Sequence, residues 1–197
     1  TKNNLLKVEL KEKGVSTLKP RKIWFDSAVL RLNAEGRGQL VGEYKGSDKL
    51  LIIDKNGYCK TVFPELTLHF DSSPIVIEKW SVKKPLTAIY HDSSKKMYYI
   101  KRFIIENENK VNKSIPENST LKFITSIPRP ILEIKFYNLG SNTQGDLTIN
   151  AEEFISIKGF KAMGNQLTSK KIKSITVSRE LEYIEEEELS LDDMEID

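Results

Sequence analysis

Short apolar runs separated by polar turns recur along this chain, and they are the feature that most limits its fold. Residues 48–62 read DKLLIIDKNGYCKTV, with strand-forming residues at 50–53, the pair Asn56-Gly57, and an alternating run that contains Lys60. Asn-Gly between two such runs is typical of a β-hairpin with a type I′ turn, in which both turn residues have positive φ. The stretch therefore predicts a hairpin with a basic residue on its second strand.

The same unit recurs downstream. Residues 85–103 (PLTAIYHDSSKKMYYIKRF) carry Lys101 and Arg102 near their end, and residues 119–136 (STLKFITSIPRPILEIKF) carry Lys135 at the corresponding place. Each stretch predicts two strands joined by a polar or proline-marked turn. The lysines of successive units are 41 and 34 residues apart, spacings near the length of a propeller blade. The repeats predict a small, bladed, all-β domain.

The rest of the chain adds strands rather than helices. Residues 2–80 show no sustained helical period, and residues 28–44 predict another hairpin around a glycine-containing turn. Residues 151–154 are compatible with one short helical turn. Single strands are predicted at residues 5–10, 23–25, 66–70, 75–80 and 170–177.

The charge of the chain is divided unevenly. The net charge is only +3, but residues 180–197 carry ten acidic and no basic residues, which leaves 31 basic and 18 acidic residues, or +13, in residues 1–179. A basic body favours a polyanionic partner such as nucleic acid; the alternative is that the surplus lysines only keep the domain in solution. We expect one folded domain at residues 1–179 and an acidic, flexible tail at residues 180–197.

The sequence carries no signal for a membrane or an oxidising compartment. No run reaches the roughly 18 apolar residues of a membrane span, and the first residues lack the apolar core of a signal peptide. Cys59 is the only cysteine, which excludes an internal disulfide and fits a reducing compartment. We expect an intracellular protein without a membrane partner. Because the sequence does not begin with Met, we also expect it to be part of a longer chain.

A search for catalytic or cofactor motifs yields none. His69 and His91 lie in different predicted units without a second ligand at metal-binding spacing, and a lone histidine in a strand is usually structural. No Gly-x-Ser-x-Gly sequence is present. Residues 159–165 have the glycines of a phosphate loop but lack the Lys-Ser/Thr pair that binds phosphate and magnesium. We expect no catalytic residue, metal or cofactor in this domain.

The most informative charged stretch is residues 158–173, which contain five lysines and no acidic residue. Gly159 and Gly164 allow the backbone to come close to a ligand, and Asn165 offers an amide donor for phosphate. The alternative is an ordinary solvated, lysine-rich loop. If the blades fan around an axis, the basic residues of the hairpins lie on one rim and form a positive track for bent duplex DNA. The predicted DNA-binding residues are Lys60, Lys101, Arg102, Lys135, Lys158, Lys161, Asn165, Lys170, Lys171 and Lys173.

Three stretches resemble the C-terminal domain of the DNA-cleaving subunit of bacterial type II topoisomerases, most closely the topoisomerase IV/gyrase-like enzymes of Bacteroidetes-type bacteria. They read KPLTAIYHDSSKKMYYIKRFII, STLKFITSIPRPILEIKF and EEFISIKGFKAMGNQLTSKKIKSI. The resemblance extends over roughly residues 5–177, with its strongest motifs at residues 98–103 and 155–168.

The resemblance implies a β-pinwheel, a propeller-like disc of about four to five blades in which neighbouring blades exchange an outer strand. It implies a non-catalytic domain that binds and bends duplex DNA on a basic rim and positions it for strand passage in a cytoplasmic, nucleoid-associated enzyme. The catalytic tyrosine, the ATPase and the metal site would belong to the rest of the DNA-cleaving subunit and to its partner, the ATPase subunit. The alternative is a propeller-like protein-interaction domain for an acidic partner.

The family's gyrases carry a glycine box, rich in glutamine and arginine, that is essential for wrapping DNA. Residues 158–165 (KGFKAMGN) keep the glycines and the basic charge of that box but not the box itself. This departure favours a topoisomerase IV-like role over gyrase-like wrapping.

Overall fold

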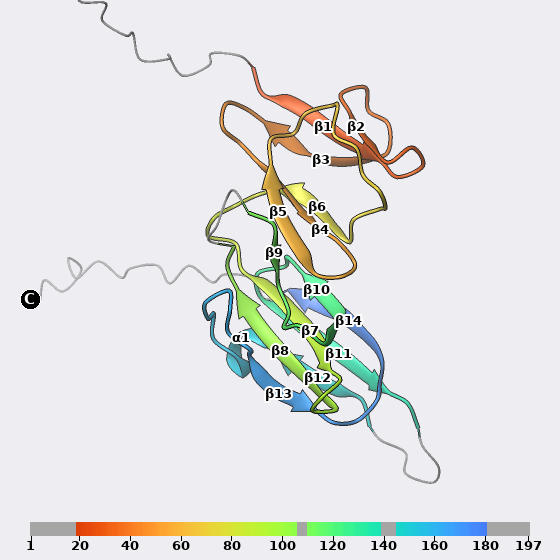
Figure 1. Ribbon diagram of the computed structural model, residues 1–197, viewed down its shortest axis with the longest axis vertical. Coiled ribbons are helices and arrows are strands. Elements are labelled where there is room, and N and C mark those ends of the chain that lie inside the picture. The colour runs from red at the N-terminus through yellow and green to blue at the C-terminus, as the bar shows by residue number, and fades with distance from the viewer. Residues whose placement is uncertain (1–18, 106–109, 139–144, 181–197) are drawn as a thin grey trace, which may run out of the picture. The chain divides into compact units, whose positions relative to one another are not determined.

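Figure 1 shows the computed structural model, which describes residues 19–105, 110–138 and 145–180. Within these residues the chain forms fourteen β-strands and one short helix, arranged in four antiparallel sheets. The contacts divide the chain into two compact units, unit 1 (Thr1–Lys83 with Ile105–Ser114) and unit 2 (Lys84–Ile104 with Ile115–Asp197). Each unit holds two sheets of three or four strands. The predicted all-β fold is confirmed.

Unit 1 consists of a three-stranded sheet in the order β2-β1-β3 and a four-stranded sheet in the order β6-β4-β5-β9. Their strands are β1 (Arg21–Asp26), β2 (Arg31–Asn33), β3 (Gln39–Tyr44), β4 (Leu50–Ile53), β5 (Tyr58–Val62), β6 (Val76–Lys79) and β9 (Asn112–Lys113). Alternate residues of β1, Ile23 and Phe25, are buried, as expected for a strand with one face in the core. They pack with Leu50 and Ile52 of β4 in the core shared by the two sheets.

The predicted hairpin of residues 48–62 is confirmed as β4 and β5, but its turn is not type I′. Only Gly57 has positive φ, at 85°, and its N–H donates to the carbonyl oxygen of Asp54 at 3.0 Å. The Asp54 carboxylate also accepts hydrogen bonds from the N–H groups of Asn56 and Tyr58. Because this side chain closes the turn, Asn56 stays at negative φ, and the loop is a short connection with glycine in the left-handed region.

Two of the predicted hairpins are wrong. In residues 28–44, β2 and β3 do not pair with each other; both flank β1, whose apolar residues occupy the centre of the sheet. In residues 119–136, β10 (Ser119–Thr125) and β11 (Pro130–Phe136) belong to different sheets. β10 pairs with β7, whereas β11 pairs with β12 and β14, so the two strands are consecutive in the chain but do not form a hairpin.

Unit 2 consists of sheets in the orders β10-β7-β8-β13 and β12-β11-β14. Its remaining elements are β7 (Leu86–Asp92), β8 (Met97–Phe103), β12 (Leu147–Asn150), α1 (Ala151–Phe154), β13 (Asn165–Thr168) and β14 (Ile172–Glu180). The predicted hairpin of residues 85–103 is confirmed as β7 and β8. The two sheets share a core that includes Ile89 and Ile100 from one and Leu132 and Ile134 from the other.

The other predicted elements have mixed outcomes. Strands at residues 23–25, 75–80 and 170–177 are confirmed as β1, β6 and β14, and the helical turn at 151–154 as α1. Residues 66–70 form no strand; His69 makes a single bridge with Arg31. The predicted strand at 5–10 and residues 181–197 of the predicted tail lie outside the described residues. No helix in the described parts is long and apolar enough to cross a membrane.

Candidate nucleic-acid interface

The ten predicted DNA-binding residues fall in different parts of the fold. Lys60 lies half-buried on β5 in unit 1, and the other nine lie in unit 2. Within unit 2 they form three groups: two cations on β8, a loop with the start of β13, and the neighbouring strands β11 and β14 with the residues just before β14. A single continuous rim that includes Lys60 stays a prediction.

Lys101 is buried, with 3% of its surface exposed. Its Nζ donates a hydrogen bond to the carbonyl oxygen of Phe160 at 2.7 Å and lies 4.7 Å from the ring centre of Phe103 and 5.4 Å from that of Phe160. The two rings meet edge to face, 5.3 Å apart. Hydrogen bonding and ring faces replace the water that a buried ammonium loses. Lys101 therefore supports the segment that carries Phe160 and is not part of the accessible basic surface.

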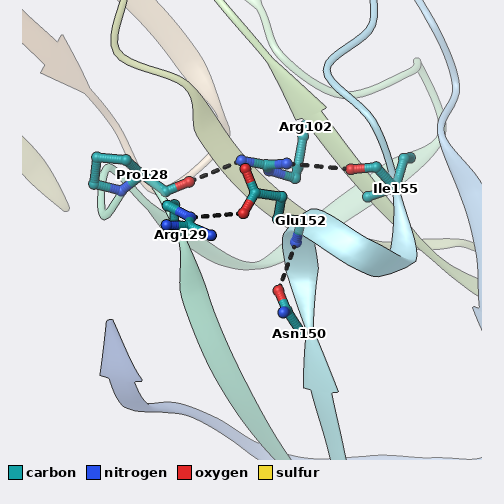
Figure 2. Close-up of polar contacts among 6 residues, drawn as sticks. All are labelled: Arg102, Pro128, Arg129, Asn150, Glu152 and Ile155. Atoms are coloured by element: carbon teal, nitrogen blue, oxygen red, sulfur yellow. Dashed lines mark hydrogen bonds and ion pairs between the residues drawn. The ribbon is translucent and has the colours of Figure 1, made fainter. Parts of the chain in front are cut away.

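Arg102 is equally buried and holds two backbone segments together, as Figure 2 shows. One terminal nitrogen donates to the carbonyl oxygen of Ile155 at 3.3 Å, and the other donates to that of Pro128 at 2.8 Å. Beside it, Nε of Arg129 donates to a carboxylate oxygen of Glu152 at 2.6 Å. A guanidinium group with these partners cannot reach a phosphate without disrupting the fold. We therefore assign Arg102 to the support of this corner of unit 2.

Residues 156–164, called here the basic loop, connect α1 with β13 and are fastened to β8 at both ends. At one end the N–H of Lys158 donates to the carbonyl oxygen of Arg102 at 2.9 Å. At the other end Gly164 has φ of 90°, and a Cβ added there would clash with the carbonyl oxygen of Ile100. Only glycine fits so close to the neighbouring backbone in this conformation. The two ends of the basic loop are thus fixed to nearby positions of one strand.

Tyr90 of β7 fastens the basic loop from a third side. Its hydroxyl donates to the carbonyl oxygen of Met163 at 2.6 Å, and its ring stacks on that of Tyr99 with 5.5 Å between ring centres. Burial, and secondarily the nearby Tyr99 and Asp92, raises the pKa of Tyr90 to about 12. The hydroxyl therefore keeps its proton, and remains a donor, at physiological pH.

These contacts leave Lys158 and Lys161 exposed on the basic loop. The ammonium of Lys158 donates to the amide oxygen of Asn165 at 3.3 Å, and the amide nitrogen of Asn165 donates to the carbonyl oxygen of Phe154 at 3.4 Å. Between the two lysines the chain turns, with the N–H of Ala162 donating to the carbonyl oxygen of Gly159 at 2.9 Å. The structure thus places three of the predicted residues on one short segment.

The second exposed group lies along β11 and β14. Lys135 pairs with Ser174, next to Lys173, and the ammonium of Lys171 lies 5.1 Å from the ring centre of Tyr137. The N–H of Tyr137 donates to the carbonyl oxygen of Lys171 at 3.0 Å, which joins the end of β11 to the start of β14. The members of this group are Lys135, Lys170, Lys171 and Lys173.

Chemical groups suited to catalysis are not gathered in the described residues. They contain no cluster of three or more His, Cys, Asp or Glu that could hold a metal ion. Cys59 is buried, and the ring of His91 lies 4.7 Å from that of Tyr98. The arrangement presents fixed cations on a surface, which suits contact with an extended anion.

Charge and glycine content alone do not identify the residues that hold the basic loop in place, nor the exposed apolar side chains on the loop. Tyr90 and the buried position of Lys101 are not among the predictions, although a lysine within the apolar strand MYYIKRF is a signal of burial. Ile157 and Met163 are exposed beside the lysines. The sequence shows that these apolar residues lie close to lysine and glycine, but it does not show whether their side chains are buried in the core or exposed on the surface.

Comparison with known proteins identifies the family of the chain. No curated protein matches the chain. A family model described as the topoisomerase C-terminal domain of Bacteroidota matches residues 31–180, which are 150 of the 197 residues and include all ten predicted DNA-binding positions. The match begins in β2 and ends with β14, so that it spans all four sheets of the two units. The chain belongs to the family of topoisomerase C-terminal domains of Bacteroidota.

Proposed function

We propose that this domain binds duplex DNA through the exposed lysines of unit 2 and positions the DNA for strand passage by a type II topoisomerase. The observation that carries the proposal is the basic loop, whose backbone is fastened to β7 and β8 while Lys158 and Lys161 remain exposed. Cations on a fixed backbone lose less conformational entropy when they bind than cations on a mobile one. Phosphate contacts orient a duplex without reading its sequence, as a topoisomerase that acts at many sites requires.

The proposed contact surface consists of the basic loop with Asn165 and the lysines along β11 and β14. Lys60 of unit 1 is a further proposed contact, on a hairpin whose turn is closed by Asp54. Lys101 and Arg102 act indirectly, because their hydrogen bonds hold the loop and the corner next to it. Their loss would weaken DNA binding through the position of the loop.

The family of the chain supports a place for this domain in a larger topoisomerase. We infer that the domain belongs to the DNA-cleaving subunit of a cytoplasmic topoisomerase IV-like enzyme and works with the rest of that subunit and with the ATPase subunit on nucleoid DNA. ATP hydrolysis and strand cleavage are assigned to those other parts, and no cofactor is assigned to this domain. Residues 158–165 lack the glutamine-arginine-rich box of gyrases, which supports the topoisomerase IV-like role.

A second candidate function is the binding of an acidic protein. The exposed apolar side chains of Ile157 and Met163 beside Lys158 and Lys161 favour it, since protein interfaces combine apolar area with charge. Binding of DNA and binding of an acidic protein are expected to differ in the salt dependence of Kd and in which ligand competes for the basic loop.

The proposal is tested by titrating the 197-residue chain with two unrelated duplex sequences across a series of salt concentrations. We expect log Kd to rise linearly with log salt, with nearly the same slope for both sequences, because counterion release dominates binding to phosphates. Failure to bind either duplex at low salt would contradict DNA binding and leave the acidic protein as the better candidate.

A further inference from the structure

Large apolar side chains are exposed in one part of unit 2. Among the described residues of this unit, four large apolar side chains are exposed, and three of them lie within ten positions of each other: Phe154, Ile157 and Met163, at 38%, 44% and 42% exposure. Single exposed apolar residues are common on protein surfaces, but their concentration in one segment calls for an explanation. The charged residues within the basic loop are both lysines.

Hydrogen bonds bring these apolar residues and the lysines together. Asn165 accepts a hydrogen bond from Lys158 and donates one to the backbone of Phe154, so that the end of α1, the loop and the start of β13 meet at this side chain. Ile157 precedes the residue that is bonded to Arg102, and Met163 precedes the glycine that packs on Ile100. Along the chain, Ile157 and Met163 therefore flank the lysine-bearing turn, and each is next to a residue that is held against β8.

The partner that suits this surface has both negative charge and an apolar interior. Duplex DNA offers phosphates on its outside and stacked bases within. Side chains such as Ile and Met of architectural proteins enter the minor groove and partly separate two base pairs. We propose that Ile157 and Met163 form a wedge that presses between neighbouring base pairs from the minor groove, while Lys158 and Lys161 hold the flanking phosphates. The wedge kinks the duplex, and this inference rests on the proposed DNA-binding function.

Side chains can separate two base pairs only if the backbone that carries them is held in place. The carbonyl group of Met163 is held by the hydroxyl of Tyr90 at 2.6 Å, and the next residue, Gly164, is in contact with β8. On the other side, the bond from Lys158 to Arg102 fixes the backbone directly after Ile157. Because the loop backbone is held at both ends, phosphate binding by its lysines does not displace the loop, and the two apolar side chains stay pressed against the bases.

The wedge makes the sequence preference of the domain depend on how easily DNA deforms. Pyrimidine–purine steps such as TA unstack more readily than other steps. We therefore expect the kink to form preferentially at a TA step, although no side chain reads the bases by hydrogen bonding.

The experiment measures bending and affinity separately on a short duplex with one central TA step and a donor and an acceptor dye at its ends. The full chain is compared with the double variant Ile157→Ser/Met163→Ser and with Val29→Ser, a matched control that removes an exposed apolar side chain of unit 1. Energy transfer is recorded at saturating protein, and Kd is obtained from the titration. Circular dichroism and thermal unfolding establish that each variant is folded.

We expect the double variant to lose most of the rise in energy transfer that the protein causes on binding. Its Kd should change by less than about threefold, because the free-energy cost of unstacking the bases is roughly equal to the gain from the inserted contacts. Val29→Ser should bend DNA like the original chain. Equal bending by the double variant would overturn the wedge and leave DNA binding intact. Tight binding by the original chain without any bending would also overturn the wedge alone, whereas an absence of binding would overturn both the wedge and the proposed function.

Discussion

The ammonium group of Lys101 lies 2.7 Å from the carbonyl oxygen of Phe160, which is 59 positions later in the chain. This bond ties the basic loop to the interior of unit 2. At Lys101 the sign of the charge suggests DNA binding, whereas the burial of the side chain supports a structural role. Its loss is expected to act first on stability and on the position of the loop.

Lys101→Met keeps an unbranched side chain, one atom shorter, and removes its charge. We expect the free energy of unfolding to fall by about 1–3 kcal/mol, because the carbonyl group of Phe160 loses a charged donor. Urea denaturation measures this change, and hydrogen exchange of residues 156–164 should become faster. The control is Lys135→Met at an exposed position of β11, which should change stability by less than about 0.5 kcal/mol. Equal effects of both substitutions would contradict the structural role.

Gly164→Ala tests the close contact between the basic loop and β8. The new Cβ would clash with the carbonyl oxygen of Ile100, and alanine is strained at φ of 90°. We expect a loss of about 2–4 kcal/mol in the free energy of unfolding, measured by chemical denaturation. Gly159→Ala is the matched control, because its added Cβ has no atom within 4 Å, and it should be nearly neutral. A loss no larger than that of the control would show that the loop does not press on β8.

Tyr90→Phe gives a prediction for pH dependence. At pH 8 the variant should be less stable by about 1 kcal/mol, since Met163 loses its hydrogen bond. The pKa of Tyr90 is about 12 in the folded protein and 10.0 for an ordinary tyrosine. The unfolded state therefore releases this proton first, and the stability that Tyr90 contributes is lost as pH rises from 10 to 12.

pH 11 is one unit above the pKa of an ordinary tyrosine, so ionisation in the unfolded state lowers the free energy of unfolding of the tyrosine protein by about 1.4 kcal/mol there. The protein with Tyr90 should therefore no longer be more stable than the Phe variant at pH 11. The measurement is the free energy of unfolding of both proteins at pH 8 and pH 11. Lysine titration affects both proteins alike and cancels in the difference. A stability difference that stays constant between the two pH values would show that Tyr90 ionises like an exposed tyrosine.

Local patterns predicted the strands of this fold better than their partners. The β4–β5 and β7–β8 hairpins followed from apolar runs joined by short polar turns, because such pairing depends on neighbouring residues. The assignment of β10 and β11 to one hairpin was wrong, because the choice between two sheets depends on contacts with β7, β12 and β14 far along the chain. No local pattern contains that information.

The candidate site was also predictable only in part, because local sequence patterns do not contain contacts between distant residues. Lys158 and Lys161 were predicted from charge and glycine content, which are properties of one short segment, and both are exposed in the structure. Charge alone could not separate them from Lys101 and Arg102, whose role depends on the carbonyl groups of residues far along the chain, namely Phe160, Ile155 and Pro128. The apolar neighbours of the loop lysines are likewise meaningful only when their exposure is known.

The double variant Lys158→Ala/Lys161→Ala tests whether the basic loop contacts phosphate. Each lysine that neutralises a phosphate should contribute about one unit to the slope of log Kd against log salt, so the double variant should lower the slope by about two and weaken binding equally for unrelated sequences. Lys122→Ala is the matched control, because Lys122 is exposed on β10, at the opposite edge of the sheet from β13. An unchanged slope in the double variant would show that the basic loop does not contact phosphate. An equal loss in the control would show that the overall charge of the domain matters and the position of the loop does not.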